Sequence, residues 1–242
     1  MGSPAFRRRC RLFLPLALLL IGACAGAEEV TVTARVAWAG ARRGGSHDSS
    51  EVVLWLTPVG AMPAMNPPAG PLPKLVQKNK SFSPHVLIVP VGSVVEFPNH
   101  DPFFHNVFSL FEGKRFDLGL YEAGTSRNVR FDKPGISYIF CNIHAEMSAV
   151  VIALPTPYYG VSTKRGEIVI PHVPAGRYTL RLWYETAQPE QLDAQTRDIT
   201  IGENSSTLGV LRLTPSQSPE SHTDKYGREY APPEPDNPAY TH

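Results

Sequence analysis

The chain has 242 residues and a mass of 26.6 kDa, a length that allows one large domain or two small ones. Hydrophobic residues make up 42% of the chain and charged residues 19%, and this usage excludes wholesale disorder and a coiled coil. The 24 prolines and 19 glycines are too many for a helical bundle and too irregularly spaced for collagen. Short strands joined by many turns are therefore expected.

The first 27 residues are typical of a secretory signal peptide. Four arginines between Arg7 and Arg11 precede an apolar run from Leu12 to Ile21, and small residues follow. The run is too short to span a bilayer comfortably, so the mature chain is expected to lack a transmembrane helix and to be periplasmic or secreted. Without the signal peptide the chain keeps 19 basic and 22 acidic side chains, which does not indicate nucleic acid as a partner.

Two processing routes stay open at the end of the signal peptide. Ala25-Gly26-Ala27 resembles an ordinary cleavage site, whereas Ile21-Gly22-Ala23-Cys24 resembles a lipobox, which would leave a lipoprotein with a lipid anchor at Cys24. Because Cys10 also lies in the leader, the mature domain keeps only Cys141 and cannot form an internal disulfide. A single thiol in an oxidising compartment raises the question of what protects or uses its sulfur.

Alternating or continuous apolar runs predict the strands in chain order. Two strands at 30–38 and 52–56 precede a linker at 61–74, in a region with six prolines between Pro58 and Pro73. Strand-like runs then recur, separated by turn residues, at 86–89, 93–97, 106–110, 128–131, 137–140 and 149–154. This pattern predicts an all-β chain of the sandwich kind.

The chain changes character after Pro155. Residues 160–170 and 177–183 are expected to pair around a turn at 172–176, and strands are expected at 196–201 and 207–213. A short helical turn near 187–195 is the one exception to the β pattern. Residues 214–242 hold six prolines and few aliphatic side chains, which predicts a disordered tail.

One short segment carries the chemistry. Cys141, His144 and Met147 follow one another at the spacing Cys-x2-His-x2-Met, on a tight loop that leaves a strand. A thiolate, an imidazole and a thioether suit copper, which tolerates soft sulfur ligands and a weak axial thioether. A trigonal site needs a second histidine, and His105 lies at the edge of the strand that starts near residue 106.

Other side chains fit this chemistry less well. His85 and His100 are expected to be surface or core-edge histidines, and Glu146 offers a hard anionic oxygen that would suit a more polar site. No His-x-His pair occurs, so the clusters of multicopper oxidases are missing from this chain. A mononuclear site with every position filled leaves no place for a substrate, so we expect no enzyme activity.

Two segments of the chain lead into the candidate ligands. The first runs from Gly92-x2-Val95-x-Phe97 to Asn99-x-Asp101 and His105-Asn106-Val107, and the second runs from Phe131-x2-Pro134-Gly135 into the Cys141 loop. Together these segments resemble the cupredoxins, the small blue copper proteins. The ligand loop is similar to that of amicyanin, and residues 75–155 as a whole resemble the cupredoxin-like proteins labelled as methylamine-utilisation proteins.

This resemblance implies a Greek-key cupredoxin domain that binds one type 1 copper ion. It makes His105, Cys141 and His144 the close ligands and Met147 the long axial ligand. Asn106 would be the residue behind the ligands that ties the two ligand loops together.

A second resemblance concerns residues 157–213. Pro171-x-Val173-Pro174-Ala175-Gly176 and Trp183 are similar to the carboxypeptidase regulatory-like sandwich, a transthyretin-like fold. The opening strands usual for that fold lie at residues 28–60. Our hypothesis is that a cupredoxin domain at 75–155 is inserted into a loop of a discontinuous domain formed by 28–60 and 156–213. The alternative is that residues 28–60 supply the first strands of the cupredoxin.

These observations predict an exported mononuclear copper protein that carries single electrons between transient redox protein partners. His144 is expected near the surface as the exit route, with Ile143, Ala145 and Ala149 forming a small apolar docking patch around it. Two alternatives remain. Copper capture or delivery would need a more exposed and exchangeable site, and a structural or adhesion sandwich would bind no metal.

Overall fold

A computed structural model describes residues 28–39, 48–62, 70–110, 113–214 and 222–230. The predicted signal peptide with Cys10 and Cys24, and residues 63–69 of the predicted linker, lie outside the described residues. The described part is nearly all β with a single short helix, so the predicted all-β fold class is confirmed. In this part of the chain no helix has the length and apolar character needed to cross a membrane.

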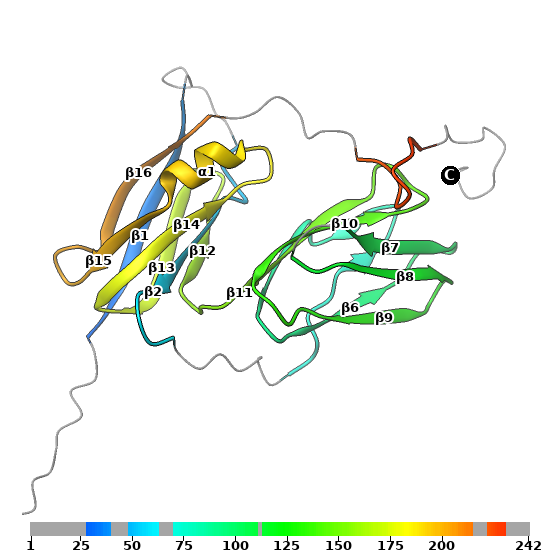
Figure 1. Cartoon of the computed structure of the whole chain (residues 1–242), viewed down its shortest axis with the longest axis horizontal. Helices are drawn as coiled ribbons and strands as arrows, with labels where there is room; N and C mark the ends of the chain where they lie inside the picture. Colours follow the sequence, from blue (N-terminus) through cyan, green and yellow to red (C-terminus); the bar gives the residue numbers. More distant parts are fainter. Residues whose placement is uncertain (1–27, 40–47, 63–69, 111–112, 215–221, 231–242) are drawn as a thin grey trace, which may run out of the picture.

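One group of strands, which we call the host sandwich, combines strands before residue 59 with strands after residue 158 (Figure 1). Its sheets have the orders β13-β1-β16 and β12-β2-β14-β15. The elements are β1 (Glu29–Trp38), β2 (Val53–Pro58), β12 (Tyr159–Val161), β13 (Glu167–Pro174), β14 (Gly176–Trp183), α1 (Pro189–Gln195), β15 (Arg197–Ile201) and β16 (Thr207–Leu213).

The core of the host sandwich follows from alternating side chains. In β1 every second residue from Val32 to Val36 is buried, which is the period of a strand with one face on a core. These side chains share a cluster with Leu54 of β2, Leu180 of β14 and Leu211 of β16, so the two sheets are packed face to face.

The expected pairing of residues 160–170 with 177–183 is wrong. Residues 160–170 divide between β12 and β13, β13 pairs antiparallel with β1, and β14 pairs with β2 and β15. The chain crosses from one sheet to the other between Pro174 and Gly176. Ile170 and Leu180 therefore enter the same core from opposite sides, which a hairpin would not allow.

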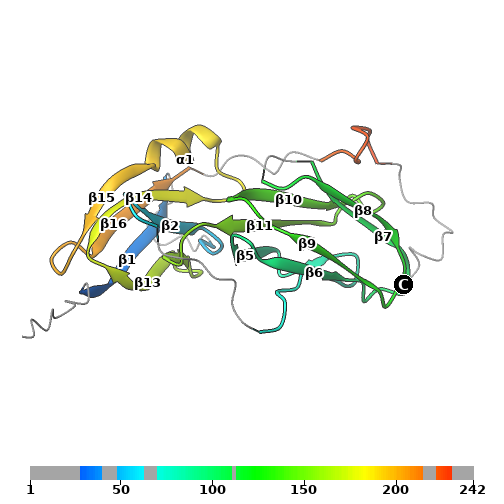
Figure 2. The ribbon, with the colours of Figure 1, turned by 60° about the horizontal axis from the view of Figure 1, so that its bottom comes forward.

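The strands between β2 and β12 form a second group, the guest sandwich, which lies end to end with the host (Figure 2). A five-stranded sheet of order β5-β11-β10-β7-β8 packs against the pair β6-β9, and β3 pairs with β4. The strands are β3 (Val76–Gln77), β4 (Phe82–Ser83), β5 (Val86–Pro90), β6 (Val94–Pro98), β7 (His105–Ser109), β8 (Phe116–Tyr121), β9 (Ser126–Arg130), β10 (Gly135–Cys141) and β11 (Ser148–Leu154). This arrangement is consistent with a cupredoxin-like sandwich.

Strand β8 is absent from the sequence-based prediction. It contains Gly119 in the left-handed region with φ of 68°, and its pairing with β7 shifts register between Asn106 and Phe108. A positive φ and a bulge interrupt the alternation on which strand prediction depends. Burial of Tyr121 in the guest core holds the strand in place.

The strand pairing bears on the hypothesis of an inserted domain. Among the described strands, β1 and β2 pair only with β12, β13, β14 and β16, all of which follow the guest sandwich in the chain. This is the pairing that an insertion requires. The domain boundaries themselves, 28–60 with 156–213 and 75–155, stay a prediction.

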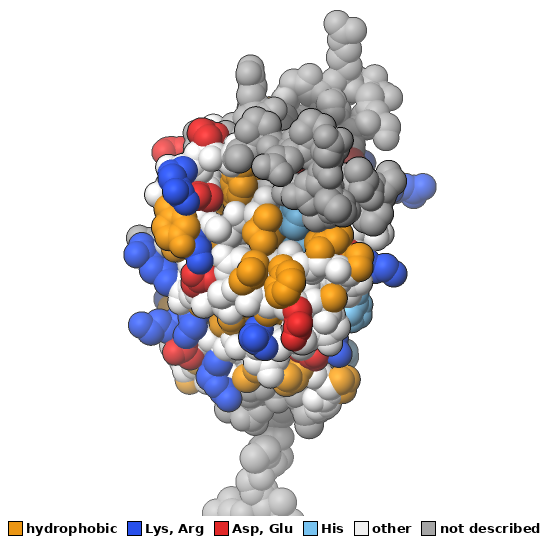
Figure 3. Space-filling model, turned by 90° about the vertical axis from the view of Figure 1, so that its right-hand side faces the viewer, with side chains coloured by type: hydrophobic (Ala, Val, Ile, Leu, Met, Phe, Trp, Pro, Cys, Tyr) orange, Lys and Arg blue, Asp and Glu red, His pale blue; other side chains and the backbone are white. Residues whose placement is uncertain are grey.

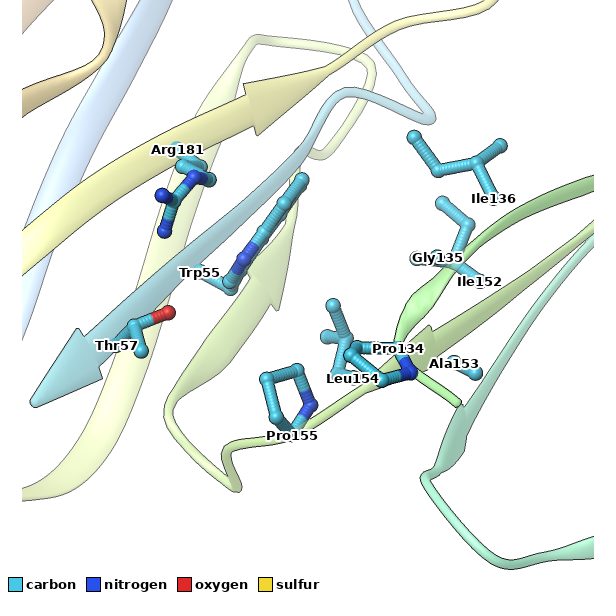
Figure 4. A pocket seen from close by; sticks show the side chains of 10 residues that line it. All are labelled: Trp55, Thr57, Pro134, Gly135, Ile136, Ile152, Ala153, Leu154, Pro155 and Arg181. Carbon is cyan, nitrogen blue, oxygen red and sulfur yellow. The ribbon is translucent and has the colours of Figure 1, made fainter. Parts of the chain in front are cut away.

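The two sandwiches meet through apolar side chains. Val53 and Trp183 of the host share a buried cluster with Val150, Ile152 and Leu154 of β11. At the rim of this contact lies a groove of about 350 Å³, shown in Figure 4. It is lined by Trp55, Thr57, Pro134, Gly135, Ile136, Ile152, Ala153, Leu154, Pro155 and Arg181.

An ion pair also bridges the two sandwiches, and it predicts a pH dependence of stability. His85 Nε2 lies 2.6 Å from a carboxylate oxygen of Glu185. This hydrogen bond raises the pKa of His85 above 6.5, against the opposing effect of burial, and the charges of Glu185 and Glu51 add to it. Because the folded-state pKa is the higher one, the stabilisation is complete below the unfolded pKa and is lost as the pH rises through the folded pKa.

We therefore expect the wild-type protein to lose unfolding free energy relative to His85→Gln as the pH rises from below 6.5 through the raised pKa of His85. Solvent screening at this partly exposed pair keeps the difference below ~1 kcal/mol. Urea unfolding of both proteins across that range measures it. Parallel pH profiles would show that the pair contributes nothing to the junction.

The C-terminal region differs from the predicted disordered tail. Residues 215–221 and 231–242 lie outside the described residues, but residues 222–230 are packed against the guest sandwich near the end of β10, where Figure 1 draws them in red. The backbone N–H of Lys225 donates to the side chain of Asn142, and the Tyr230 hydroxyl donates to the carbonyl of Cys141. Contacts of His222, Lys225 and Tyr230 hold this segment on the guest sandwich. The prediction of a disordered tail used proline content and did not take these side chains into account.

Candidate metal centre

Neighbouring strands bring His105 and Cys141 together. Cys141 ends β10 directly opposite Val107 of β7, and His105 begins β7 two residues before Val107. Residues two apart on a strand point to the same face, so His105 and Cys141 share the buried side of the sheet. His144 returns to the same place because the loop after β10 turns sharply, with the Met147 N–H donating to the His144 carbonyl at 3.1 Å.

The three side chains converge on one point. The ligating atoms of His105, Cys141 and His144 lie within 4.8 Å of one another. The Cys141 Sγ is 3.6 Å from His105 Nδ1 and 3.5 Å from His144 Nδ1. The exposed fractions are 0%, 0% and 2%, so this is an enclosed site with two nitrogen donors and one sulfur donor.

Burial keeps both imidazoles in the neutral form that binds metals. Burial, together with the nearby His105 ring, lowers the pKa of His144 to about 4. Burial also lowers the pKa of His105, although Asp101 opposes this effect. Near neutral pH each ring therefore offers an unprotonated nitrogen.

The surroundings of Cys141 shift the pKa of its thiol in two opposite directions. Burial raises the pKa of Cys141, so the free thiol is protonated near neutral pH. The backbone N–H groups of Asn106, Ile143 and His144 act in the opposite direction and would stabilise a thiolate. A cation at the site would therefore displace the proton and find amide donors already aimed at the sulfur.

Asp101 orients the first histidine, a role that the sequence analysis did not assign. Its carboxylate accepts a hydrogen bond from His105 Nε2 at 2.9 Å, which leaves Nδ1 facing the sulfur. Asp101 is itself held by the backbone N–H groups of Asn79 and Lys80. Although burial raises it, these donors and His105 keep the pKa of Asp101 below its usual value. In the sequence, the only indication of this role is that Asp101 lies four residues before the candidate ligand His105.

We expect Asp101→Asn to weaken metal binding about 10- to 100-fold, because an amide can present N–H instead of a carboxylate oxygen and no longer fixes the ring. Competition of a copper chelator against the wild type and the variant measures the change. Glu122→Gln, which changes an exposed carboxylate that is not part of the cluster, is the matched control. Equal affinities of wild type and Asp101→Asn would remove Asp101 from the site.

Asn106 connects the two ligand loops mainly through its backbone. Its carbonyl accepts the N–H of Asn142 at 2.8 Å, directly after Cys141. Its side-chain N–H group donates to Asp117 of β8 at 2.6 Å rather than to the Cys141 loop. The Asn106 backbone thus joins the two loops, and its side chain fastens β7 to β8. A role for Asn106 behind the ligands stays a prediction.

Met147 lies beside the cluster in the core. Its side chain is fully buried in the same apolar cluster as Cys141, and its carbonyl accepts the Cys141 N–H at 3.2 Å. These contacts close the loop from 141 to 147 into a compact ring. An axial role for the thioether stays a prediction.

The remaining expected residues can be placed. His100 and Glu146 are exposed and His85 pairs with Glu185, so none of them belongs to the cluster. His144 itself is buried rather than near the surface, because the Phe103 ring packs against it with 5.5 Å between the two ring centroids. Ala149 is 1% exposed within β11, so its predicted place in a docking patch is wrong.

No family model matches the chain, and no curated protein matches it. Among solved structures, a purple cupredoxin from Nitrosopumilus maritimus is similar over 34% of this chain and 99% of its own, with 22% identity and a TM-score of 0.31. A reduced mutant of amicyanin is similar over 39% of this chain and 97% of its own, with 18% identity and a TM-score of 0.33. A Cu-containing nitrite reductase from Thermus scotoductus is similar over 40% of this chain, with 28% identity and a TM-score of 0.34, and the match spans only 28% of its own length.

Proposed function

We propose that this protein is an exported mononuclear type 1 copper protein that carries single electrons between protein partners. The observation that carries the proposal is the buried convergence of His105, Cys141 and His144, whose ligating atoms lie within 4.8 Å of one another. Two neutral imidazoles and one thiolate are a donor set that suits copper, with the Met147 thioether as a weak fourth ligand.

The residues present fit such an ion. Burial favours the neutral form of both imidazoles, in which one ring nitrogen is free to bind a metal, and three backbone N–H groups would stabilise a thiolate. A bound copper would supply a one-electron couple between Cu(I) and Cu(II). The chain holds the donors in place through Asp101 and through the closed loop from 141 to 147, so little rearrangement is needed when the charge at the site changes.

The burial of the site favours electron carriage over copper delivery. Delivery needs a ligand that an acceptor can approach and replace, but the three donors are at most 2% exposed. An enclosed site with its donors already placed also leaves no open position for a substrate, so we propose no enzyme activity. Electrons can cross a few ångströms of protein without exposing the ion.

A docking face for the redox partner is proposed at the end of the guest sandwich that carries the cluster. Ile143 is 36% exposed, Phe104 is 51% exposed and Ala145 is exposed, and each is next in sequence to a cluster residue or to the Phe103 that covers it. Figure 3 shows several apolar side chains on this end of the molecule. A small apolar patch suits a transient partner.

The location of the protein belongs to the same proposal. Its support is the signal-peptide pattern in residues 1–27, and release into the periplasm or lipid anchoring at Cys24 are the two outcomes. Mass spectrometry of the mature protein from its membrane and soluble fractions would distinguish them.

The experiment for the function is a copper titration of the full mature chain. We expect one Cu(II) per chain, an intense visible thiolate-to-copper absorption band, and its reversible loss and return on chemical reduction and oxidation. Rapid transfer of Cu(I) to a chelator without that band would indicate delivery. No retained copper would leave a structural or adhesion role.

A further inference from the structure

Residues 222–230 form a compact turn, which we call the strap. Asp224 organises it by accepting the backbone N–H groups of Tyr226 at 2.9 Å and Arg228 at 2.8 Å. The Asp224 N–H donates to the Arg228 carbonyl, and the Arg228 guanidinium pairs with the Asp224 carboxylate at 3.1 Å. Gly227 takes a φ of 76°, as the turn requires.

The strap is fastened to the guest sandwich at three places, two of them at or directly after the ligand Cys141. The Lys225 N–H donates to the Asn142 side chain at 2.9 Å, and the Lys225 ammonium pairs with Asp117 at 2.8 Å. Asp117 is the same carboxylate that accepts from the side chain of Asn106. The third link is the Tyr230 hydroxyl, which donates to the Cys141 carbonyl at 2.7 Å.

His222 supports the third link. Its ring stacks on Phe140, the residue before Cys141, with centroids 4.1 Å apart and planes 26° apart. Its Nδ1 lies 3.3 Å from the Tyr230 hydroxyl oxygen. Because the single hydroxyl proton of Tyr230 goes to the Cys141 carbonyl, Nδ1 of His222 is the donor in this second hydrogen bond.

With the strap in place, three backbone groups at Cys141 and Asn142 are hydrogen-bonded. The Cys141 N–H donates to Met147, the Asn142 N–H donates to Asn106, and the Cys141 carbonyl accepts from Tyr230. Any local opening that moves the Cys141 backbone out of the site must release the last of these bonds or carry the strap along with the loop.

We propose that the strap locks the Cys141 loop and that Tyr230 is a positioning residue of the metal centre, acting through the Cys141 carbonyl. The inference builds on the proposed copper function, but the locking of the loop belongs to the metal-free protein as well. Tyr230 contacts Cys141 through its backbone carbonyl, not through the ligating sulfur. Its role is to keep the cysteine in the conformation that faces both histidines.

The test is the rate at which a water-soluble aromatic disulfide reacts with Cys141 in the metal-free mature chain that begins at residue 28, in which Cys141 is the only cysteine. In Tyr230→Phe one neutral hydrogen bond is lost, so we expect the open population and the rate to rise about fivefold. Lys225→Ala removes the Asp117 ion pair and should also raise the rate. Tyr226→Phe is the matched control on the same strap, because Tyr226 is 65% exposed, and it should stay within about twofold of wild type.

A second readout separates positioning from general destabilisation. Copper(II)-loaded Tyr230→Phe should show a shifted thiolate-to-copper band, while Tyr226→Phe keeps the wild-type spectrum. An unchanged thiol reaction rate in Tyr230→Phe overturns the proposal whatever the spectrum shows. If the wild type itself develops no such band, the copper proposal fails, and the thiol rates still decide whether the strap locks the loop.

Discussion

Cys141→Ser is expected to abolish the visible thiolate-to-copper band and to weaken copper binding by at least roughly 100-fold, since even partners behind the ligands contribute 10- to 100-fold to metal affinity. The sulfur is the only soft, anionic donor among the three convergent groups. A serine oxygen is harder, and it stays protonated near neutral pH, so it would neither supply the band nor balance the charge of the ion. Copper titration against a competing chelator, followed by absorption spectroscopy, measures both effects.

The control for this variant is Ser109→Ala. Ser109 is fully buried on β7, the strand that also carries His105, but its hydroxyl has no hydrogen-bond partner within the described part of the chain. Its removal should leave copper affinity and the spectrum unchanged. A Cys141→Ser protein that bound copper with the wild-type stoichiometry and spectrum would refute the ligand assignment.

Trp183→Ala is expected to reduce the free energy of unfolding by about 3–5 kcal/mol, the usual cost of truncating a large buried aromatic side chain. Trp183 is 2% exposed and packs in the cluster that joins β14 of the host sandwich to β11 of the guest. Its indole N–H also donates to the hydroxyl of Tyr138 at 3.4 Å. Urea unfolding monitored by circular dichroism measures the loss.

The same variant should uncouple the two sandwiches. With this contact weakened, we expect calorimetry to resolve two transitions where the wild type shows one. Val169→Ala is the control, because Val169 is 55% exposed on β13, and it should change the unfolding free energy by less than ~0.5 kcal/mol. A loss below about 1 kcal/mol for Trp183→Ala would mean that the junction contributes little to stability.

The sequence by itself determined the local features of this protein. Alternation of apolar residues placed most strands to within a few residues, because a half-buried strand repeats every two positions whatever it pairs with. The spacing from Cys141 to His144 was also readable from the sequence, because a single tight loop between them brings both side chains together. His105 could be named because it begins a strand that follows a turn.

Only the tertiary structure decided which segments meet. The pairing of β1 with β13 and β16 joins residues more than a hundred positions apart, and the assignment of β13 and β14 to opposite sheets depends on a shared core, not on either strand alone. Asp101 and Tyr230 gained their roles in the same way, through contacts with His105 and Cys141. Strand periodicity and loop spacing depend on neighbouring residues, whereas sheet order and the supports of a buried site depend on packing across the whole chain.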